Sequence, residues 1–331
     1  EGKLICRVMN EGIIKGHKSV NVPNVHINLP ALTEKDRRFI EWAIRADIDF
    51  IAHSFVRSAR DLNEIQEILD AHNSHLKIIA KIENQQGIDN LDEILTYSYG
   101  VMVARGDLGV EIPAERIPLI QRDIVKACRD RKKPVIIATQ MLQSMIENPR
   151  PTRAEVTDVA NAIFQSADAI MLSGESAYGK YPVEAVKTMT KIALQTERTI
   201  DVNLELNLKN AVKPVAVVIA RALVAATQEL PVKALVFDTY TGRVGRYLST
   251  YRPKVPVYAM CYNSCTMREL ALVFGVKAYP FSKVNDKEEF SAKSIEMLTR
   301  EGKISQGDLV GFIGGVFGAQ MGATYMELKY V

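Results

Sequence analysis

Short apolar runs alternate with longer helical patterns between about residues 33 and 193 of this chain. Each run holds four to six mostly apolar residues and ends in polar ones. Such alternation is typical of βα units that build a parallel sheet, and we predict five of them. The predicted strands are residues 49–54, 77–82, 100–104, 134–139 and 168–173, and the predicted helices between them include 34–46, 59–72, 118–131 and 153–165.

The segments on either side of this region have different patterns. Residues 4–27 alternate apolar and polar positions around Gly12, Gly16 and Pro23, which predicts a short antiparallel β segment. After about residue 199 the α/β pattern restarts and predicts a second α/β domain. Its predicted helices are 215–228, one after Gly242, 264–274 and 287–301, and its predicted strands are 233–237, 255–260, 309–313 and 324–330.

Polar residues gather at the carboxyl end of every predicted strand of the first region, which is where a TIM barrel carries its chemistry. Lys81 and Glu83 are two residues apart, so they project from the same face of their strand. The next strand ends in Arg105, Gly106 and Asp107. Two carboxylates and a lysine at adjacent strand ends can hold Mg²⁺ and a phosphoryl group. The alternative is a solvated surface pair followed by a simple turn.

The amino-acid composition limits which binding partners and which cellular setting we expect. The chain has 331 residues, 47% of them hydrophobic and 24% charged, which are ordinary values for a soluble protein. A net charge of +3 without a basic cluster argues against nucleic-acid binding. No run of about 18 apolar residues predicts a membrane span, and no signal peptide opens the chain. The spacing of Cys6, Cys128, Cys261 and Cys265 indicates neither a disulfide framework nor a zinc site, so we expect a reduced, cytoplasmic setting.

Five strand-end motifs, in this order, closely resemble pyruvate kinase. They are Lys-Ile-Glu-Asn at 81–84, Ala-Arg-Gly-Asp-Leu-Gly-Val-Glu-Ile-Pro at 104–113, Ala-Thr-Gln-Met-Leu at 138–142, Arg-Pro-Thr-Arg-Ala-Glu at 150–155 and Ser-Gly-Glu-Ser-Ala-Tyr-Gly-Lys-Tyr-Pro at 173–182. The resemblance implies a partial TIM (β/α)8 barrel, its last five βα units, at residues 29–198. It also implies a remnant of a small β domain at 1–28 and a C-terminal α/β effector and oligomerisation domain at 199–331.

The resemblance further implies phosphoryl transfer from phosphoenolpyruvate to ADP, giving pyruvate and ATP. Glu83 and Asp107 would bind Mg²⁺ or Mn²⁺, and Lys81 would neutralise the transferring phosphoryl group. The substrate would also contact Ala104, Arg105, the backbone amides of Gly106 and Asp107, and Thr139. Proton delivery to the enolate would involve Thr139, Ser173 and Glu175, and Lys18 would contact nucleotide phosphate.

Plainer roles stay open for some of these residues. Thr139 could cap a helix. Ser173 and Glu175 could form a turn.

A loop of the second domain resembles the phosphate loop with which relatives bind a sugar-phosphate activator. It comprises Thr239, Thr241, Gly242 and Arg243, and Val244 stands where a hydroxyl residue is common. The Gly-rich segment at 314–322 matches the position of the effector loop of the family. The resemblance thus implies a possible phosphorylated effector and a homotetramer when full length.

Two segments of the family pattern, Arg-x-Asn-x-Ser-His-Gly and Asp-Thr-Lys-Gly, do not occur in this chain. In the family they supply a substrate-phosphate arginine and the ligands of K⁺, so the K⁺ ligands would lie outside this chain. We therefore expect a fragment that does not turn over by itself. Two alternatives are a metal-dependent lyase or aldolase of the phosphoenolpyruvate/pyruvate superfamily and a non-catalytic metabolite-binding module.

Overall fold

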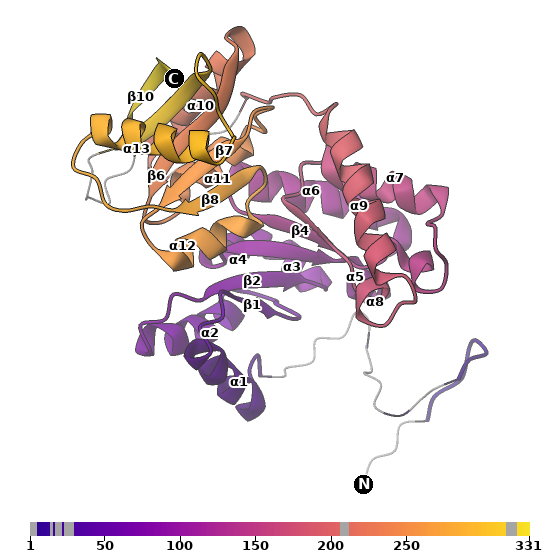
Figure 1. Ribbon diagram of the computed structural model, residues 1–331. Helices are drawn as coiled ribbons and strands as arrows, with labels where there is room; N and C mark the ends of the chain where they lie inside the picture. Colours follow the sequence, from indigo (N-terminus) through magenta and orange to yellow (C-terminus); the bar gives the residue numbers. More distant parts are fainter. Residues whose placement is uncertain (1–4, 14–15, 17–21, 23–29, 206–211, 316–322) are drawn as a thin grey trace.

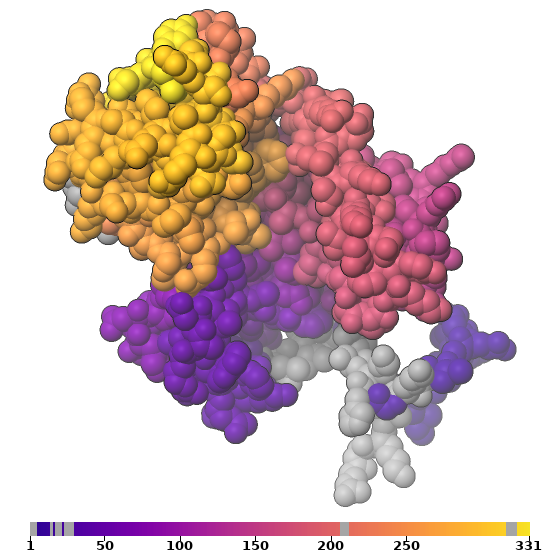
Figure 2. All heavy atoms as spheres, in the orientation of Figure 1, coloured from indigo at the N-terminus to yellow at the C-terminus, as the bar shows by residue number. Residues whose placement is uncertain are grey.

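The computed structural model describes residues 5–13, 16, 22, 30–205, 212–315 and 323–331 (Figure 1). Two α/β units follow one another along the chain, and the second packs against the first (Figure 2). Residues 5–13 are exposed and carry no strand, and neither do residues 16 and 22. The rest of the predicted β segment, with Lys18, lies outside the described residues.

The first unit contains a five-stranded parallel sheet whose strands lie in chain order. The strands are β1 Phe50–His53, β2 Lys77–Ile82, β3 Gly100–Ala104, β4 Val135–Ala138 and β5 Ala169–Met171. All five predicted strands are confirmed, most of them shorter than predicted. Within the described ranges β1 and β5 each pair with a single strand, so this part of the barrel is an open arc.

Helices follow the strands and cover one face of the arc. The long ones are α1 Glu34–Arg45, α2 Ala59–Ala71, α6 Ile117–Asp130, α7 Arg153–Phe164 and α9 Pro182–Glu197. Capping boxes start α1 and α7 at Thr33 and Thr152. Each threonine hydroxyl accepts a hydrogen bond from the backbone amide three residues later, and the acidic side chain at that position accepts one from the threonine amide. The sequence pattern missed the short elements α3 Gln85–Asp89, α4 Leu91–Tyr97, α5 Arg105–Glu111, α8 Gly174–Ala177, η1 Ala114–Arg116 and η2 Gln143–Ile146.

The second unit has a sheet in the order β10-β9-β6-β7-β8, with β10 antiparallel to β9 and the other pairs parallel. The strands are β6 Val232–Thr239, β7 Val257–Cys261, β8 Val276–Pro280, β9 Leu309–Gly315 and β10 Ala323–Tyr330, and the helices are α10 Pro214–Glu229, α11 Arg243–Thr250, α12 Ser264–Glu269, η3 Leu270–Leu272 and α13 Lys287–Arg300. The edge strand β8 was not predicted. The helix predicted for 264–274 was wrong at its end: α12 stops at Glu269 and η3 continues to Leu272.

Each unit has its own apolar core. Buried isoleucine, leucine and valine side chains fill the space between the first sheet and its helices, and separate clusters lie on the two faces of the second sheet. Among the described helices, none combines the length and the apolar character needed to cross a membrane.

Ion pairs join the two units. Arg252 of the second unit is buried, and its Nη1 lies 3.0 Å from Asp168 Oδ1 at the start of β5. Arg268 Nε lies 2.7 Å from Asp49 Oδ1, just before β1. Lys77 Nζ lies 3.6 Å from Glu269 Oε1. Because these contacts involve the amino ends of β1, β2 and β5, the second unit packs on the side of the arc opposite to the carboxyl ends.

Lys133 lies at this interface, where Arg246 and Arg252 line the same small cavity. Burial, with the nearby Arg246 guanidinium adding to it, lowers the pKa of Lys133 from 10.5 to about 8. Below pH 8 this lysine is charged in the folded and the unfolded chain, so folding carries the full cost of burying the charge. That cost disappears as the pH rises from the folded to the unfolded pKa, so this residue's contribution to stability increases between pH 8 and 10.5.

We therefore expect Lys133→Met to stabilise the chain more at pH 7.5 than at pH 9.5. The difference between the two pH values should be roughly 1–2 kcal/mol in the free energy of unfolding, measured by urea denaturation. Both the ammonium and the neutral amine can donate to the Ser98 carbonyl, so methionine loses this hydrogen bond at both pH values. The control is Lys126→Met, the same substitution at an exposed lysine on α6. A Lys133→Met effect that does not vary with pH would contradict the assignment.

Candidate active site

A buried ion pair ends β2. Lys81 Nζ lies 2.7 Å from Glu83 Oε1, so the two side chains share one face, as the strand periodicity predicted. Lys81 also donates to Ser54 Oγ at 2.8 Å. The Glu83 side chain is fully buried, and its Oε2 accepts the Phe55 amide at 2.6 Å. The carboxyl ends of β1 and β2 are thereby joined around one carboxylate.

Asp107 lies in α5, which starts directly after β3. The parallel register pairs Lys81 with Met102 and Ile82 with Val103, so Glu83 and the start of α5 lie at the same edge of the sheet. Asp107 is half-buried, and its carboxylate makes no hydrogen bond or ion pair with any residue in the described ranges. This acid is therefore available for a ligand.

Thr139 follows β4 and reaches across to α5. Its Oγ1 accepts the Gly106 amide at 2.8 Å and donates to the Ala138 carbonyl at 2.6 Å. Thr139 and Gln140 have φ angles of 68° and 57°, a left-handed conformation that costs side-chain-bearing residues free energy and is concentrated at functional sites. Thr139 thus accepts an amide from the first turn of α5, whose N-cap residue is Ala104. The Gly106 amide is bonded to Thr139 in this structure, and its predicted contact with a substrate carboxylate stays a prediction.

Arg105 is buried. Its Nη1 lies 2.7 Å from Asp158 Oδ1 on α7, and its Nη2 donates to the Thr139 carbonyl at 2.6 Å. The guanidinium therefore helps to position Thr139, and substrate binding by Arg105 stays a prediction.

Glu175 is also fully buried and acts as an anchor between loops. Its Oε1 accepts the Leu142 amide at 3.0 Å, and its Oε2 accepts the Ser173 amide at 2.8 Å. Both oxygens are engaged by backbone amides, and the role of Glu175 in proton delivery stays a prediction. Ser173 is half-buried directly before α8.

Comparison with known sequences decides the family. The family model described as "Pyruvate kinase, barrel domain" matches residues 1–186, and the one described as "Pyruvate kinase, alpha/beta domain" matches residues 217–326. Pyruvate kinase of Geobacillus stearothermophilus is 49% identical over 333 residues, covering 100% of this chain and 57% of its own length. Those of Borreliella burgdorferi and Clostridium acetobutylicum are 46% and 45% identical, cover 99% and 98% of this chain, and are themselves covered to 70% and 69%.

The chain belongs to the pyruvate kinase family. The resemblance carried by the five strand-end motifs is therefore confirmed, and so is the fold of a barrel part followed by a C-terminal α/β domain. The chain spans 57% of the length of the Geobacillus pyruvate kinase.

The pyruvate kinase motifs converge at one edge of the barrel sheet. Lys81, Glu83, Gly106, Asp107 and Thr139 all lie at or just after the carboxyl ends of β2, β3 and β4. Ala104 ends β3 and is buried.

Sequence reasoning missed the parts played by Ser54, Phe55 and Asp158. Ser54 was visible as a polar strand-end residue, whereas the contacts of Phe55 and Asp158 are made through tertiary structure and had no sequence signal.

Hydrogen bonds from neighbouring residues engage the backbone of the candidate effector loop in this structure. The Thr239 hydroxyl accepts the amides of Thr241 and Gly242 at 3.2 and 2.8 Å, and Gly242 has a left-handed φ of 66°. Asn263 and Thr266 hold the loop through the Tyr240 carbonyl. The loop amides are therefore engaged by Thr239, while Thr241 is exposed and Arg243 is half-buried. Residues 316–322 of the Gly-rich segment lie outside the described residues.

Proposed function

We propose that this chain carries the metal- and phosphoryl-binding part of a pyruvate kinase site, which transfers a phosphoryl group from phosphoenolpyruvate to ADP and releases pyruvate. The observation that supports this best is the Lys81–Glu83 pair at 2.7 Å, with Glu83 fully buried, at the edge where Asp107 has no partner among the described residues. Such transfers depend on positioning and on neutralising charge, and this edge brings a cation and two carboxylates together.

The donor set fits a hard divalent cation. Glu83 Oε1 is buried and accepts no hydrogen bond from the described residues beyond its ion pair with Lys81, and the Asp107 carboxylate is open. Carboxylate oxygens are the ligands that Mg²⁺ and Mn²⁺ prefer. Bound there, Mg²⁺ or Mn²⁺ would supply charge stabilisation for the phosphoryl group. K⁺ is expected from the family resemblance, with ligands outside this chain.

Each residue of the proposed site then has a separate role in binding or proton transfer. The Lys81 ammonium, which is partly exposed, pairs with phosphoryl oxygens while staying beside Glu83. Ala104, Arg105, Gly106 and Asp107 line the substrate through the first turn of α5. The Thr139 hydroxyl, or a water that it holds, delivers the proton to the enolate, which requires the hydroxyl to leave the Ala138 carbonyl. Ser173 borders the same space.

Further properties follow the family resemblance. We propose that Lys18 contacts the nucleotide and that the Thr239–Arg243 loop binds a phosphorylated effector by exchanging the Thr239 hydroxyl for phosphate at the amides of Thr241 and Gly242. We also propose a cytoplasmic setting, a homotetramer for the full-length protein, and neither a nucleic-acid partner nor a membrane partner.

Calorimetry of phosphoenolpyruvate binding to residues 1–331, with and without Mg²⁺, tests the proposal. Binding that requires the metal, without ATP formation by this fragment when ADP is added, is the expected result. Cleavage of a carbon–carbon bond in a 2-oxo acid would instead support the lyase alternative. Binding of phosphoenolpyruvate without any metal requirement would contradict the proposed site.

A further inference from the structure

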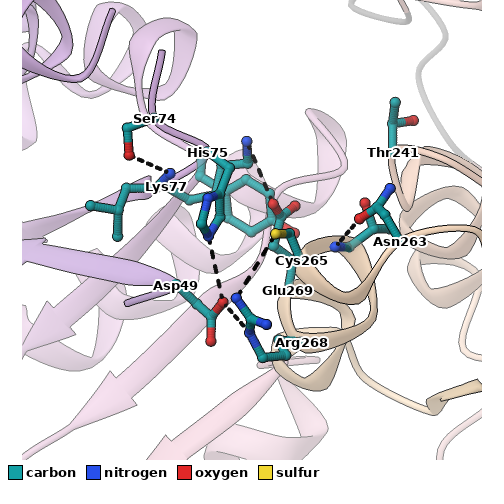
Figure 3. A network of polar contacts seen from close by, with 12 residues as sticks. Asp49, Ser74, His75, Lys77, Thr241, Asn263, Cys265, Arg268 and Glu269 are labelled. Atoms are coloured by element: carbon teal, nitrogen blue, oxygen red, sulfur yellow. Dashed lines mark hydrogen bonds and ion pairs between the residues drawn. The ribbon is translucent and has the colours of Figure 1, made fainter. Parts of the chain in front are cut away.

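Three metal-ligating side chains from distant parts of the sequence meet at the interface between the two units. Asp47 follows α1, His75 precedes β2, and Cys265 belongs to α12 of the second unit. A carboxylate oxygen of Asp47, an imidazole nitrogen of His75 and the sulfur of Cys265 all lie within 4.8 Å of one another. Figure 3 shows His75, Asp49, Cys265 and Arg268 pointing toward one another. His75 lies at the amino end of β2, whereas the candidate active site lies at the carboxyl ends of the strands.

His75 Nε2 is the unsatisfied atom of the group. It is inaccessible to solvent and has no hydrogen-bond partner among the described residues. Asp47 Oδ1 lies 3.3 Å away and Asp49 Oδ1 4.0 Å away, contacts that become ion pairs only when the ring is protonated. This nitrogen, which lies near two carboxylates and makes no hydrogen bond to the described residues, has a lone-pair position that a metal ion can take.

A cation already occupies part of this space. Arg268 Nε lies 2.7 Å from Asp49 Oδ1, its Nη2 lies 2.9 Å from Asp47 Oδ2, and Nη2 also lies 3.9 Å from Cys265 Sγ. The guanidinium therefore serves as the counter-ion of the two aspartates. Its side chain is 32% exposed, so it can swing into solvent when another cation enters.

The local charges favour a divalent ion. Asp47, Asp49 and Glu269 carry three negative charges, while Arg268 and Lys77 carry two positive ones, so the network has a net charge of −1. Adding a divalent cation, releasing the Cys265 proton and moving the Arg268 guanidinium into solvent leaves this sum at −1, because the ion adds two charges while the thiolate and the departing guanidinium each remove one. No compensating change elsewhere in the fold is needed.

We propose that Asp47, His75 and Cys265 bind a zinc ion, with Asp49 as the fourth ligand. Zn²⁺ is borderline soft and takes thiolate, imidazole and carboxylate ligands in tetrahedral sites. The ligand atoms of Asp47, His75 and Cys265 lie within 4.8 Å of one another, and Asp49 Oδ1 lies 4.0 Å from His75 Nε2, so modest side-chain movements bring them to one ion. Because the ligands come from both units, the bound ion links the barrel part to the C-terminal domain and restrains their relative movement.

Titration of residues 1–331 with Zn²⁺, followed by calorimetry, and with Co²⁺, followed by absorption, tests the proposal. We expect one ion per chain and a thiolate-to-cobalt charge-transfer band. Cys265→Ser, which is nearly isosteric, should abolish the band and weaken Zn²⁺ binding by about tenfold or more. The matched control is Cys6→Ser, which changes an exposed cysteine far from the interface and should leave both signals unchanged.

Arg268→Gln should change the Zn²⁺ affinity in the opposite direction to Cys265→Ser. Because it removes the cation that competes for Asp47 and Asp49, Zn²⁺ binding should tighten by about tenfold. If the network is only a salt-bridged interface, Arg268→Gln weakens the domain contact and no thiolate band forms in any variant. A band that survives Cys265→Ser, or Zn²⁺ binding that Arg268→Gln weakens, would overturn the proposal. A far-ultraviolet circular dichroism spectrum of each variant checks that it is folded.

Discussion

Replacing Arg105 by methionine is expected to lower the free energy of unfolding by about 3 kcal/mol. The side chain is only 9% exposed, and it connects three parts of the barrel: the start of α5, Asp158 on α7 and the Thr139 carbonyl after β4. Methionine fills a similar volume but leaves the buried Thr139 carbonyl without its donor and Asp158 without its cation. Urea denaturation at pH 7 measures the change.

The control for Arg105 is Arg122→Met. Arg122 lies on α6 with 61% of its side chain exposed and a distant 3.7 Å contact to Asp123, so we expect a change within about 0.5 kcal/mol. If Arg105→Met costs no more than this control, the guanidinium does not position Thr139.

Replacing Lys81 by methionine is expected to weaken phosphoenolpyruvate binding in the presence of Mg²⁺ by roughly 10- to 100-fold. The ammonium would otherwise form a charge-assisted contact with the phosphoryl oxygens while it remains 2.7 Å from Glu83. Isothermal titration calorimetry gives the affinity. Methionine retains the aliphatic length, so the change reports the charge rather than a cavity.

Lys126→Met removes the same charge from an exposed position on α6 and should leave phosphoenolpyruvate affinity unchanged. Equal effects of the two changes would mean that Lys81 acts only through net charge. In that case the ammonium has no direct contact with the substrate.

Much of the fold was predictable because its signals are local. The five strands of the barrel part follow from apolar runs, and the start of α7 follows from Thr152 and Glu155, which form a capping box. The strand β8 was missed because Val276–Pro280 is a partly exposed edge strand that ends in proline and lacks a long apolar run. The short helix α5 was missed because Arg-Gly-Asp has the composition of a turn.

The candidate site was predictable in its residue types but only partly in its contacts. The same-face arrangement of Lys81 and Glu83 follows from a period of two along a strand. The roles of Arg105 and Glu175 could not be deduced in this way, because their partners Asp158 and Leu142 are brought to them by tertiary packing. For the same reason the sequence argued against a zinc site, since Asp47, His75 and Cys265 are far apart along the chain and meet only where the two units pack.

Mn²⁺ titration followed by electron paramagnetic resonance tests the central claim most directly, since the claim is that Glu83 and Asp107 form a divalent-metal site beside Lys81. Residues 1–331 should bind one Mn²⁺ at this site, and phosphoenolpyruvate should change its spectrum. Glu83→Gln and Asp107→Asn should each weaken that binding by roughly 100-fold or more, whereas Asp123→Asn, a 71% exposed control, should not. Mn²⁺ binding that is unaffected by both site changes would contradict the account.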